Sequence, residues 1–199
     1  MSYAVVLNGE IPDKITDDFI VCCDGGYDRL KAIDIEPNIL LGDMDSIQNV
    51  PCRDIIYYPP EKDATDGELA TDYCIEKGAT KINFYGIFGG RPDHVEGNYS
   101  LMYKAFKQGI EVAGFSKDYA VYMVDKPLTL KNVKNKTISI VPFLDMVHIN
   151  SLKGLKYKAD NLQIAKSSSR GVSNEAEQNE VTIDISSGVA LVFVINSWR

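Results

Sequence analysis

Three short apolar runs in the first half of the chain end in glycine and aspartate. The segments that follow them are Asp24-Gly25-Gly26, Gly42-Asp43-Met44-Asp45-Ser46 and Gly89-Gly90-Arg91-Pro92-Asp93-His94. Glycine lets backbone N–H groups approach phosphate oxygens, and carboxylates are the hard oxygen ligands that Mg²⁺ prefers. Because aspartate and glycine are also common in ordinary turns, each segment by itself is weak evidence for a site.

A fourth acidic segment, Glu61-Lys62-Asp63-Ala64-Thr65-Asp66, comes directly before the most clearly helical part of the chain. Thr65 as a helix N-cap explains part of it. The cap does not explain why Lys62 and Asp63 precede it. Because like charges repel at close range, a gathering of acids is typical of a cation site. The four segments together predict a site that holds Mg²⁺ and phosphate oxygens.

The elements that must position these segments follow an alternating pattern over residues 1–117. Short apolar strands alternate with amphipathic helices, which is typical of a mostly parallel sheet with flanking helices. The expected strands are 4–7, 19–23, 39–41, 55–58, 81–85 and 110–114, and the expected helices are 66–77 and about 95–108. Since ligands of open α/β sheets bind at the carboxyl ends of the strands, the acidic segments are expected to share one sheet edge.

The last third of the chain has a different pattern, which predicts a second domain over residues 118–199. The helical period disappears, and short alternating segments predict an all-β domain. The expected strands are 120–124, 137–141, 146–150, 155–159, 181–185 and 189–195. The polar stretch 167–179 between them is expected to be a long loop, and long ordered loops are often functional.

Composition and charge exclude several classes of protein. The net charge of −7, without a cluster of basic residues, argues against binding to nucleic acid. The longest apolar run, 189–195, is far shorter than a membrane span, and the first residues are expected to form a strand rather than a signal peptide. The four cysteines lack the spacing of zinc sites and the density of a disulfide scaffold, so a cytoplasmic location is expected.

Common nucleotide-binding and hydrolase motifs are absent from the sequence. It contains no GxxxxGK[ST], GxGxxG, HExxH or GxSxG. His94-Val95-Glu96 matches the HxE of zinc deaminases, but the PCxxC that these enzymes require is missing. His94 is therefore expected to form a local hydrogen bond or to face phosphate.

The segments, in this order and spacing, resemble the blocks of the thiamine pyrophosphokinase family. The matching blocks are DGGYDRL at 24–30, LLGDMDSI at 40–47, EKDATDGELA at 61–70, GGRPDHVEGN at 89–98, and GLKY with SRGVSNE in the last third. The resemblance implies an α/β domain that binds ATP and Mg²⁺, a C-terminal β-sandwich that binds thiamine, and a homodimer. The implied reaction converts ATP and thiamine to AMP and thiamine diphosphate.

The resemblance also implies a role for each matching residue. Mg²⁺ would be held by Asp43, Asp45, Asp63 and Asp66. Lys62 would contact phosphate, and Arg91 with Asp93 would act on the transferred group. The nucleotide site would be lined by Asp24, Gly25, Gly26, Ser46, Thr65, Gly90 and His94. Thiamine would be bound by Ser169, Arg170, Ser173 and Asn174, with Trp198 as a candidate for stacking on the thiazolium ring.

Two alternatives remain open at the level of sequence. The same fold and Mg²⁺ site would serve a phosphoryl transferase whose acceptor is a different small alcohol, selected by the loop at 167–179. The acidic cluster alone also does not exclude a nucleotide-sensing module without turnover.

Overall fold

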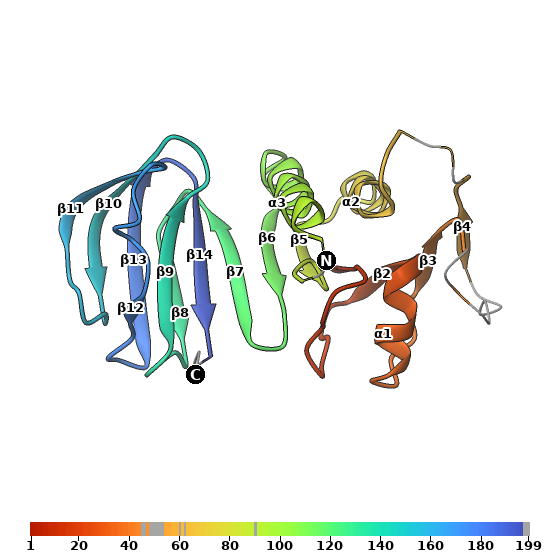
Figure 1. Ribbon diagram of the computed structural model, residues 1–199, viewed down its shortest axis with the longest axis horizontal. Helices are drawn as coiled ribbons and strands as arrows, with labels where there is room; N and C mark the ends of the chain where they lie inside the picture. Colours follow the sequence, from red (N-terminus) through yellow and green to blue (C-terminus); the bar gives the residue numbers. More distant parts are fainter. Residues whose placement is uncertain (45–46, 48–53, 60, 62, 90, 197–199) are drawn as a thin grey trace. The chain divides into compact units, whose positions relative to one another are not determined.

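The computed structural model describes residues 1–44, 47, 54–59, 61, 63–89 and 91–196. The chain divides into two compact units, Met1–Lys117 and Asp118–Arg199 (Figure 1). Of the candidate site residues, Asp45, Ser46, Lys62, Gly90 and Trp198 lie outside the described residues. No helix within the described ranges is long and apolar enough to cross a membrane.

The described residues of unit 1 form six parallel strands with helices on both faces. Their order across the sheet is β6-β5-β1-β2-β3-β4, and every pair is parallel. The strands are β1 (Ser2–Val6), β2 (Phe19–Cys23), β3 (Ile39–Gly42), β4 (Ile55–Tyr57), β5 (Lys81–Tyr85) and β6 (Glu111–Phe115). The helices are the 3₁₀ turn η1 (Asp24–Gly26), α1 (Tyr27–Lys31), α2 (Asp66–Glu76) and α3 (Pro92–Phe106).

The central strands of this sheet are buried on both faces, as near-continuous apolar runs predict. Figure 1 shows α1 on one face of the sheet and α2 with α3 on the other. On the α1 face, Tyr27 and Leu30 pack against Val6, Cys22 and Leu40. This packing fixes the ends of β1, β2 and β3 relative to one another, and these are the strands that lead into the candidate site.

Unit 2 is built from two antiparallel layers. One layer has the order β12-β9-β14-β7 and the other has the order β11-β10-β13-β8. The strands are β7 (Tyr119–Val124), β8 (Leu128–Lys131), β9 (Thr137–Pro142), β10 (Met146–Lys153), β11 (Asp160–Ala165), β12 (Asn174–Glu175), β13 (Glu180–Ser187) and β14 (Ala190–Ile195).

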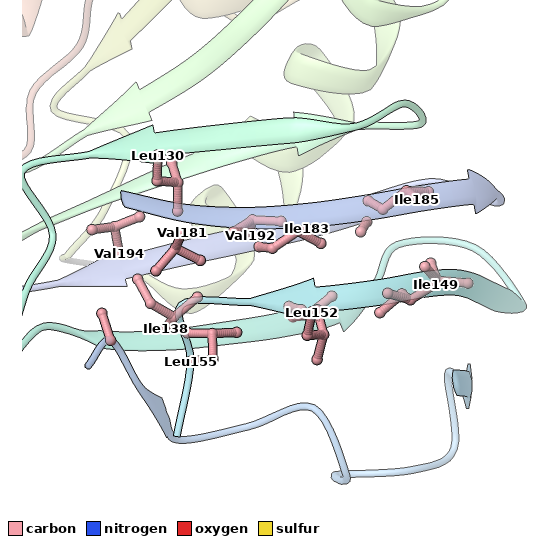
Figure 2. Close-up of a cluster of buried hydrophobic side chains, with 14 of the residues drawn as sticks. Leu130, Ile138, Ile149, Leu152, Leu155, Val181, Ile183, Ile185, Val192 and Val194 are labelled. Atoms are coloured by element: carbon pink, nitrogen blue, oxygen red, sulfur yellow. The ribbon is translucent and has the colours of Figure 1, made fainter. Parts of the chain in front are cut away.

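The core of unit 2 lies between these layers. Ile138 and Val192 from one layer and Ile149 and Ile183 from the other belong to one buried cluster, which Figure 2 shows in close-up. Buried and accessible residues alternate over 180–186 of β13 and over 146–150 of β10, where a register shift follows, because successive side chains of a strand point to opposite faces. An α/β unit followed by an all-β sandwich confirms the fold class expected from the sequence.

Several local predictions are wrong. A strand over 155–159 does not form, because Leu155 makes only an isolated bridge with Ala176 before the chain turns, and β11 begins at Asp160. The polar stretch 167–179 is not all loop, since it contains the two-residue strand β12.

Three short or terminal features escaped the sequence patterns. Helix α3 begins at Pro92 rather than at residue 95, because proline is well suited to the first turn of a helix. Helix α1 and strand β8 were not expected. Each is only four or five residues long, which is too short for periodicity to reveal.

Replacing Ile149 by alanine should destabilise unit 2. Its side chain is 1% exposed in the core between the two layers. We expect Ile149→Ala to lower the free energy of unfolding by about 2–5 kcal/mol, measured by urea denaturation. Lys153→Ala, on the same strand but exposed, should change it by less than about 0.5 kcal/mol. Equal losses in the two variants would contradict this assignment of the core.

Candidate active site

The carboxyl ends of the parallel strands bring separate acidic segments to one edge of the sheet. In the parallel register Val6 pairs with Cys22 and Cys23 pairs with Leu41. Asp24 follows β2 immediately and is only 4% exposed, and Asp43 follows β3. Both carboxylates therefore leave the sheet at the edge where open α/β folds bind their ligands.

Two of these acids, Asp24 and Asp66, lie close to Gly42. A Cβ atom added to Gly42 would lie 2.8 Å from the Cβ atom of Asp24 and 3.4 Å from the Oδ2 atom of Asp66. Gly42 has a φ of +149°, a conformation that residues with side chains rarely adopt. Asp24 and Asp66 thus lie against the residue that directly precedes Asp43. Segments that are far apart in the sequence converge here.

Asp66 reaches this position because it is the first residue of α2. The Oγ1 atom of Thr65 accepts a hydrogen bond of 3.2 Å from the N–H group of Glu68, so Thr65 is the N-cap of α2. Gly67 is buried, and a Cβ atom there would lie 3.0 Å from Leu101. The cap and this close packing fix where the first turn of α2 presents Asp66. Asp63 is exposed ahead of the cap.

The segment that joins β5 to α3 presents Arg91 and Asp93 as a pair. The Nε atom of Arg91 donates a 3.1 Å hydrogen bond to Asp93, and a second guanidinium nitrogen contacts the other carboxylate oxygen. The hydrogen bonds from Arg91 lower the pKa of Asp93. Both side chains are mostly exposed, at 72% and 61%, and so is His94 in the first turn of α3. Arg91 can therefore leave Asp93 for an incoming anion at little cost.

The end of β1 contributes a part of this edge that the sequence analysis did not identify. A Cβ atom on Gly25 would lie 2.9 Å from the side chain of Asn8, and Arg29 donates a 3.2 Å hydrogen bond to the Asn8 carbonyl. Gly9 donates its N–H to Gly86 at 2.8 Å and has no room for a side chain. A glycine two residues after the expected first strand, 4–7, was the available signal, because glycine in such a place marks a close approach of backbones.

The donor set at this edge suits Mg²⁺. In the described part of the chain no three carboxylate, imidazole or thiol side chains are placed to hold a metal ion by themselves. Protein sites for Mg²⁺ commonly supply one or two carboxylates and leave the other positions to water and substrate phosphate. Asp24 and Asp66 against Gly42, with Asp43 next in the chain, provide hard oxygen donors of this kind.

In unit 2, close backbone packing holds the candidate substrate-binding segment against β9. The N–H group of Ile140 donates to the Gly171 carbonyl at 2.8 Å, and a Cβ atom on Gly171 would lie 2.1 Å from the Ile140 carbonyl oxygen. The N–H group of Ser173 donates to the Ser139 Oγ atom at 3.0 Å. The segment is therefore an ordered part of the sandwich.

The candidate substrate-binding side chains of unit 2 have different surroundings. The Asn174 amide binds the backbone of Tyr157, accepting from its N–H at 3.0 Å and donating to its carbonyl at 2.8 Å. Arg170 lines an open, polar pocket of about 430 Å³ together with Lys158 and Gln163. Ser169 is exposed beside Arg170. The pocket offers hydrogen-bonding groups and positive charge to a ligand.

The parallel sheet with its acidic edge, followed by the sandwich, defines an α/β protein with a candidate ligand site at the carboxyl ends of its strands. Two family models match the chain: thiamin pyrophosphokinase, catalytic domain, over residues 15–113, and thiamin pyrophosphokinase, vitamin B1 binding domain, over residues 126–190. The chain is 33% identical over 178 residues to a thiamine pyrophosphokinase of Bacillus subtilis (strain 168), which covers 85% of this chain and 83% of the relative.

Solved structures agree with these matches. A crystal structure of thiamine pyrophosphokinase from Bacillus subtilis has a TM-score of 0.88 at 29% identity and covers 100% of both chains. One from Geobacillus thermodenitrificans has a TM-score of 0.82 at 27% identity and covers 99% of this chain and 98% of the other. The chain belongs to the thiamine pyrophosphokinase family.

Adding a methyl group at Gly171 should detach its segment from β9. The new Cβ atom would overlap the Ile140 carbonyl oxygen, so we expect Gly171→Ala to lower the melting temperature and to speed hydrogen exchange of the Ile140 amide. The matched control is Gly97→Ala in α3, where a Cβ atom meets nothing within 4 Å. This control should be neutral or stabilising by up to about 1 kcal/mol. Unchanged exchange at Ile140 would contradict the packing described.

Proposed function

We propose that this chain transfers the pyrophosphoryl group of ATP to the hydroxyethyl oxygen of thiamine, giving thiamine diphosphate and AMP. Membership of the thiamine pyrophosphokinase family supports the reaction. The observation that carries the proposal in the structure is the convergence of Asp24 and Asp66 on Gly42, directly before Asp43. This is the donor chemistry that a metal-bound triphosphate requires.

The reaction sets two physical requirements. The thiamine oxygen attacks the β-phosphorus while AMP leaves from the opposite side, so the attacking and leaving oxygens must be held in line. The charge on the phosphate oxygens must also be neutralised. Mg²⁺, when bound, would supply that neutralisation by coordinating phosphate oxygens.

The residues of unit 1 meet these requirements as follows. Asp43 and Asp66, with Asp45 and Asp63, would hold Mg²⁺, and Asp24 beside them would complete the acidic wall. Lys62 would contact phosphate as a point charge. Arg91, once released from Asp93, would bind the transferred group. Gly25, Gly26 and Gly90 would let the backbone approach the nucleotide, and Ser46, Thr65 and His94 would contact its phosphates.

The residues of unit 2 would recognise the acceptor. Ser169, Arg170 and Ser173 would offer hydrogen bonds to thiamine, and Asn174 would hold the neighbouring Tyr157 backbone in place. Trp198 is proposed to stack on the cationic thiazolium ring. We also propose that the protein acts as a cytoplasmic homodimer.

The products distinguish this proposal from its alternatives. When the protein is incubated with thiamine, ATP and Mg²⁺, we expect AMP and thiamine diphosphate in equal amounts, measured by chromatography. A pyrophosphoryl transfer releases AMP, whereas transfer of one phosphoryl group releases ADP. Formation of ADP would favour a kinase for another alcohol, and absence of turnover with nucleotide binding intact would favour a sensing module.

Two substitutions test the acidic edge directly. Asp66→Asn removes a charged oxygen donor, and Gly42→Ala adds a Cβ atom where Asp24 and Asp66 meet. Each should lower kcat by about 100-fold or more. Asp66→Asn would weaken the binding of the metal by removing a negative charge, and Gly42→Ala would displace Asp24, where an error of about 1 Å in positioning can have that effect. Initial rates of AMP formation provide the measurement, and circular dichroism checks the fold. The control is Gly97→Ala, for which a folded protein is expected. Wild-type rates in both variants would refute the proposed site.

A further inference from the structure

A lysine on α3 forms a three-way ionic contact with α2. The Nζ atom of Lys104 lies 3.0 Å from the Oε1 atom of Glu68 and 2.6 Å from the Oδ1 atom of Asp72. All three side chains are more than half buried, with exposed fractions of 36%, 38% and 39%. The contact joins two helices that each begin at the carboxyl edge of the same sheet.

This contact resolves a repulsion within α2. Glu68 and Asp72 are four residues apart, so they lie on one face of the helix, where like charges destabilise it. Burial lowers the pKa of Lys104, but its hydrogen bonds to Asp72 and Glu68 outweigh this effect and raise the pKa above its usual value. Lys104 therefore remains charged and holds both acids.

The contact also reaches the first turn of α2, where Asp66 lies. Glu68 makes two hydrogen bonds: its backbone N–H group donates to the capping Thr65, and its carboxylate accepts from Lys104. On the same side, the side chain of Leu101 lies close to Gly67, the residue between Asp66 and Glu68. The turn that carries Asp66 is thus fixed by its cap and by two residues of α3 that are three positions apart.

We propose that Lys104 is a positioning residue, which sets the rotation of the first turn of α2 so that the Asp66 carboxylate meets Gly42 and Asp24. The inference rests on the proposed function, since Asp66 matters through its role there. Lys104 acts through Glu68 and the backbone of the turn. A link to Glu68 in the first turn is what the role requires, and the link to Asp72, one turn further along, is secondary.

The test compares Lys104→Met, which keeps the length and apolar stem of the side chain, with Lys104→Arg, which keeps the charge. In the AMP assay we expect Lys104→Met to lower kcat about 10-fold while the KM for thiamine changes less than about 2-fold, because positioning is lost rather than substrate contact. Lys104→Arg should retain at least about half of the wild-type kcat. Lys81→Met is the control. It removes a similar ion pair, with Glu111, at the N-terminal ends of β5 and β6, away from the carboxyl edge of the sheet.

Two further variants separate positioning from general stability. Glu68→Gln and Asp72→Asn each remove one carboxylate from the same contact, but only Glu68 belongs to the first turn of α2. We expect Glu68→Gln to lower kcat several-fold and Asp72→Asn to leave it within about 2-fold of wild type. Equal effects of the two variants on kcat would overturn the proposal. It would also be overturned if the loss of kcat in each variant, Lys81→Met included, simply followed the drop in melting temperature. If Lys104→Met does not fold, this pair still decides.

A binding measurement keeps the inference separate from the proposed function. Mg²⁺ with a non-hydrolysable ATP analogue should raise the melting temperature of the wild type, and Lys104→Met should show a clearly smaller rise, whereas Lys81→Met should match the wild type. A wild type that makes no AMP would refute the proposed function alone. An undiminished rise in Lys104→Met would refute the positioning role.

Discussion

Carboxylates at one sheet edge repel one another. The strands and helices of unit 1 hold them close together in spite of this repulsion. Asp24 is held by the end of β2, Asp66 by the capped first turn of α2, and Asp43 by the end of β3. Gly42 makes the arrangement possible because a side chain there would overlap Asp24. Such a concentration of negative charge favours a divalent cation, and only with that cation bound would it accept a phosphate substrate.

The two units divide the work that a group transfer requires. Unit 1 places acidic side chains at the carboxyl edge of a buried parallel sheet, where in the proposed function they would hold a cation that neutralises the charge on a triphosphate. Unit 2 has a different design, in which close backbone contacts such as that between Gly171 and Ile140 hold a polar segment on a stable sandwich. Family membership connects the first design with catalysis and the second with recognition of the vitamin.

Much of the fold could be predicted from the sequence, because buried strands and helices each require a characteristic spacing of apolar residues. Apolar runs such as 19–23 and the stripe of α2 are long enough to show which faces are covered. Helix α1 and strand β8 are too short to do so. The expected strand at 155–159 does not form, because Tyr157 binds the side chain of Asn174 and Leu155 makes only an isolated bridge with Ala176. The acids at the sheet edge were recognisable from their places after strands. Asn8 was not, since its contact with Gly25 depends on tertiary packing, and Gly9 left only the weak signal of a glycine after the first strand.

In the proposed function, the acids around Gly42 would hold Mg²⁺ and, through it, the phosphates of ATP. The most direct measurement is a crystal structure with Mn²⁺ in place of Mg²⁺ and a non-hydrolysable ATP analogue, in which anomalous scattering locates the metal. The account predicts an anomalous peak within about 2.5 Å of carboxylate oxygens from Asp43 or Asp66, with the β-phosphate bound to the same ion. A metal and triphosphate bound away from this edge, with these carboxylates in contact with neither, would contradict it.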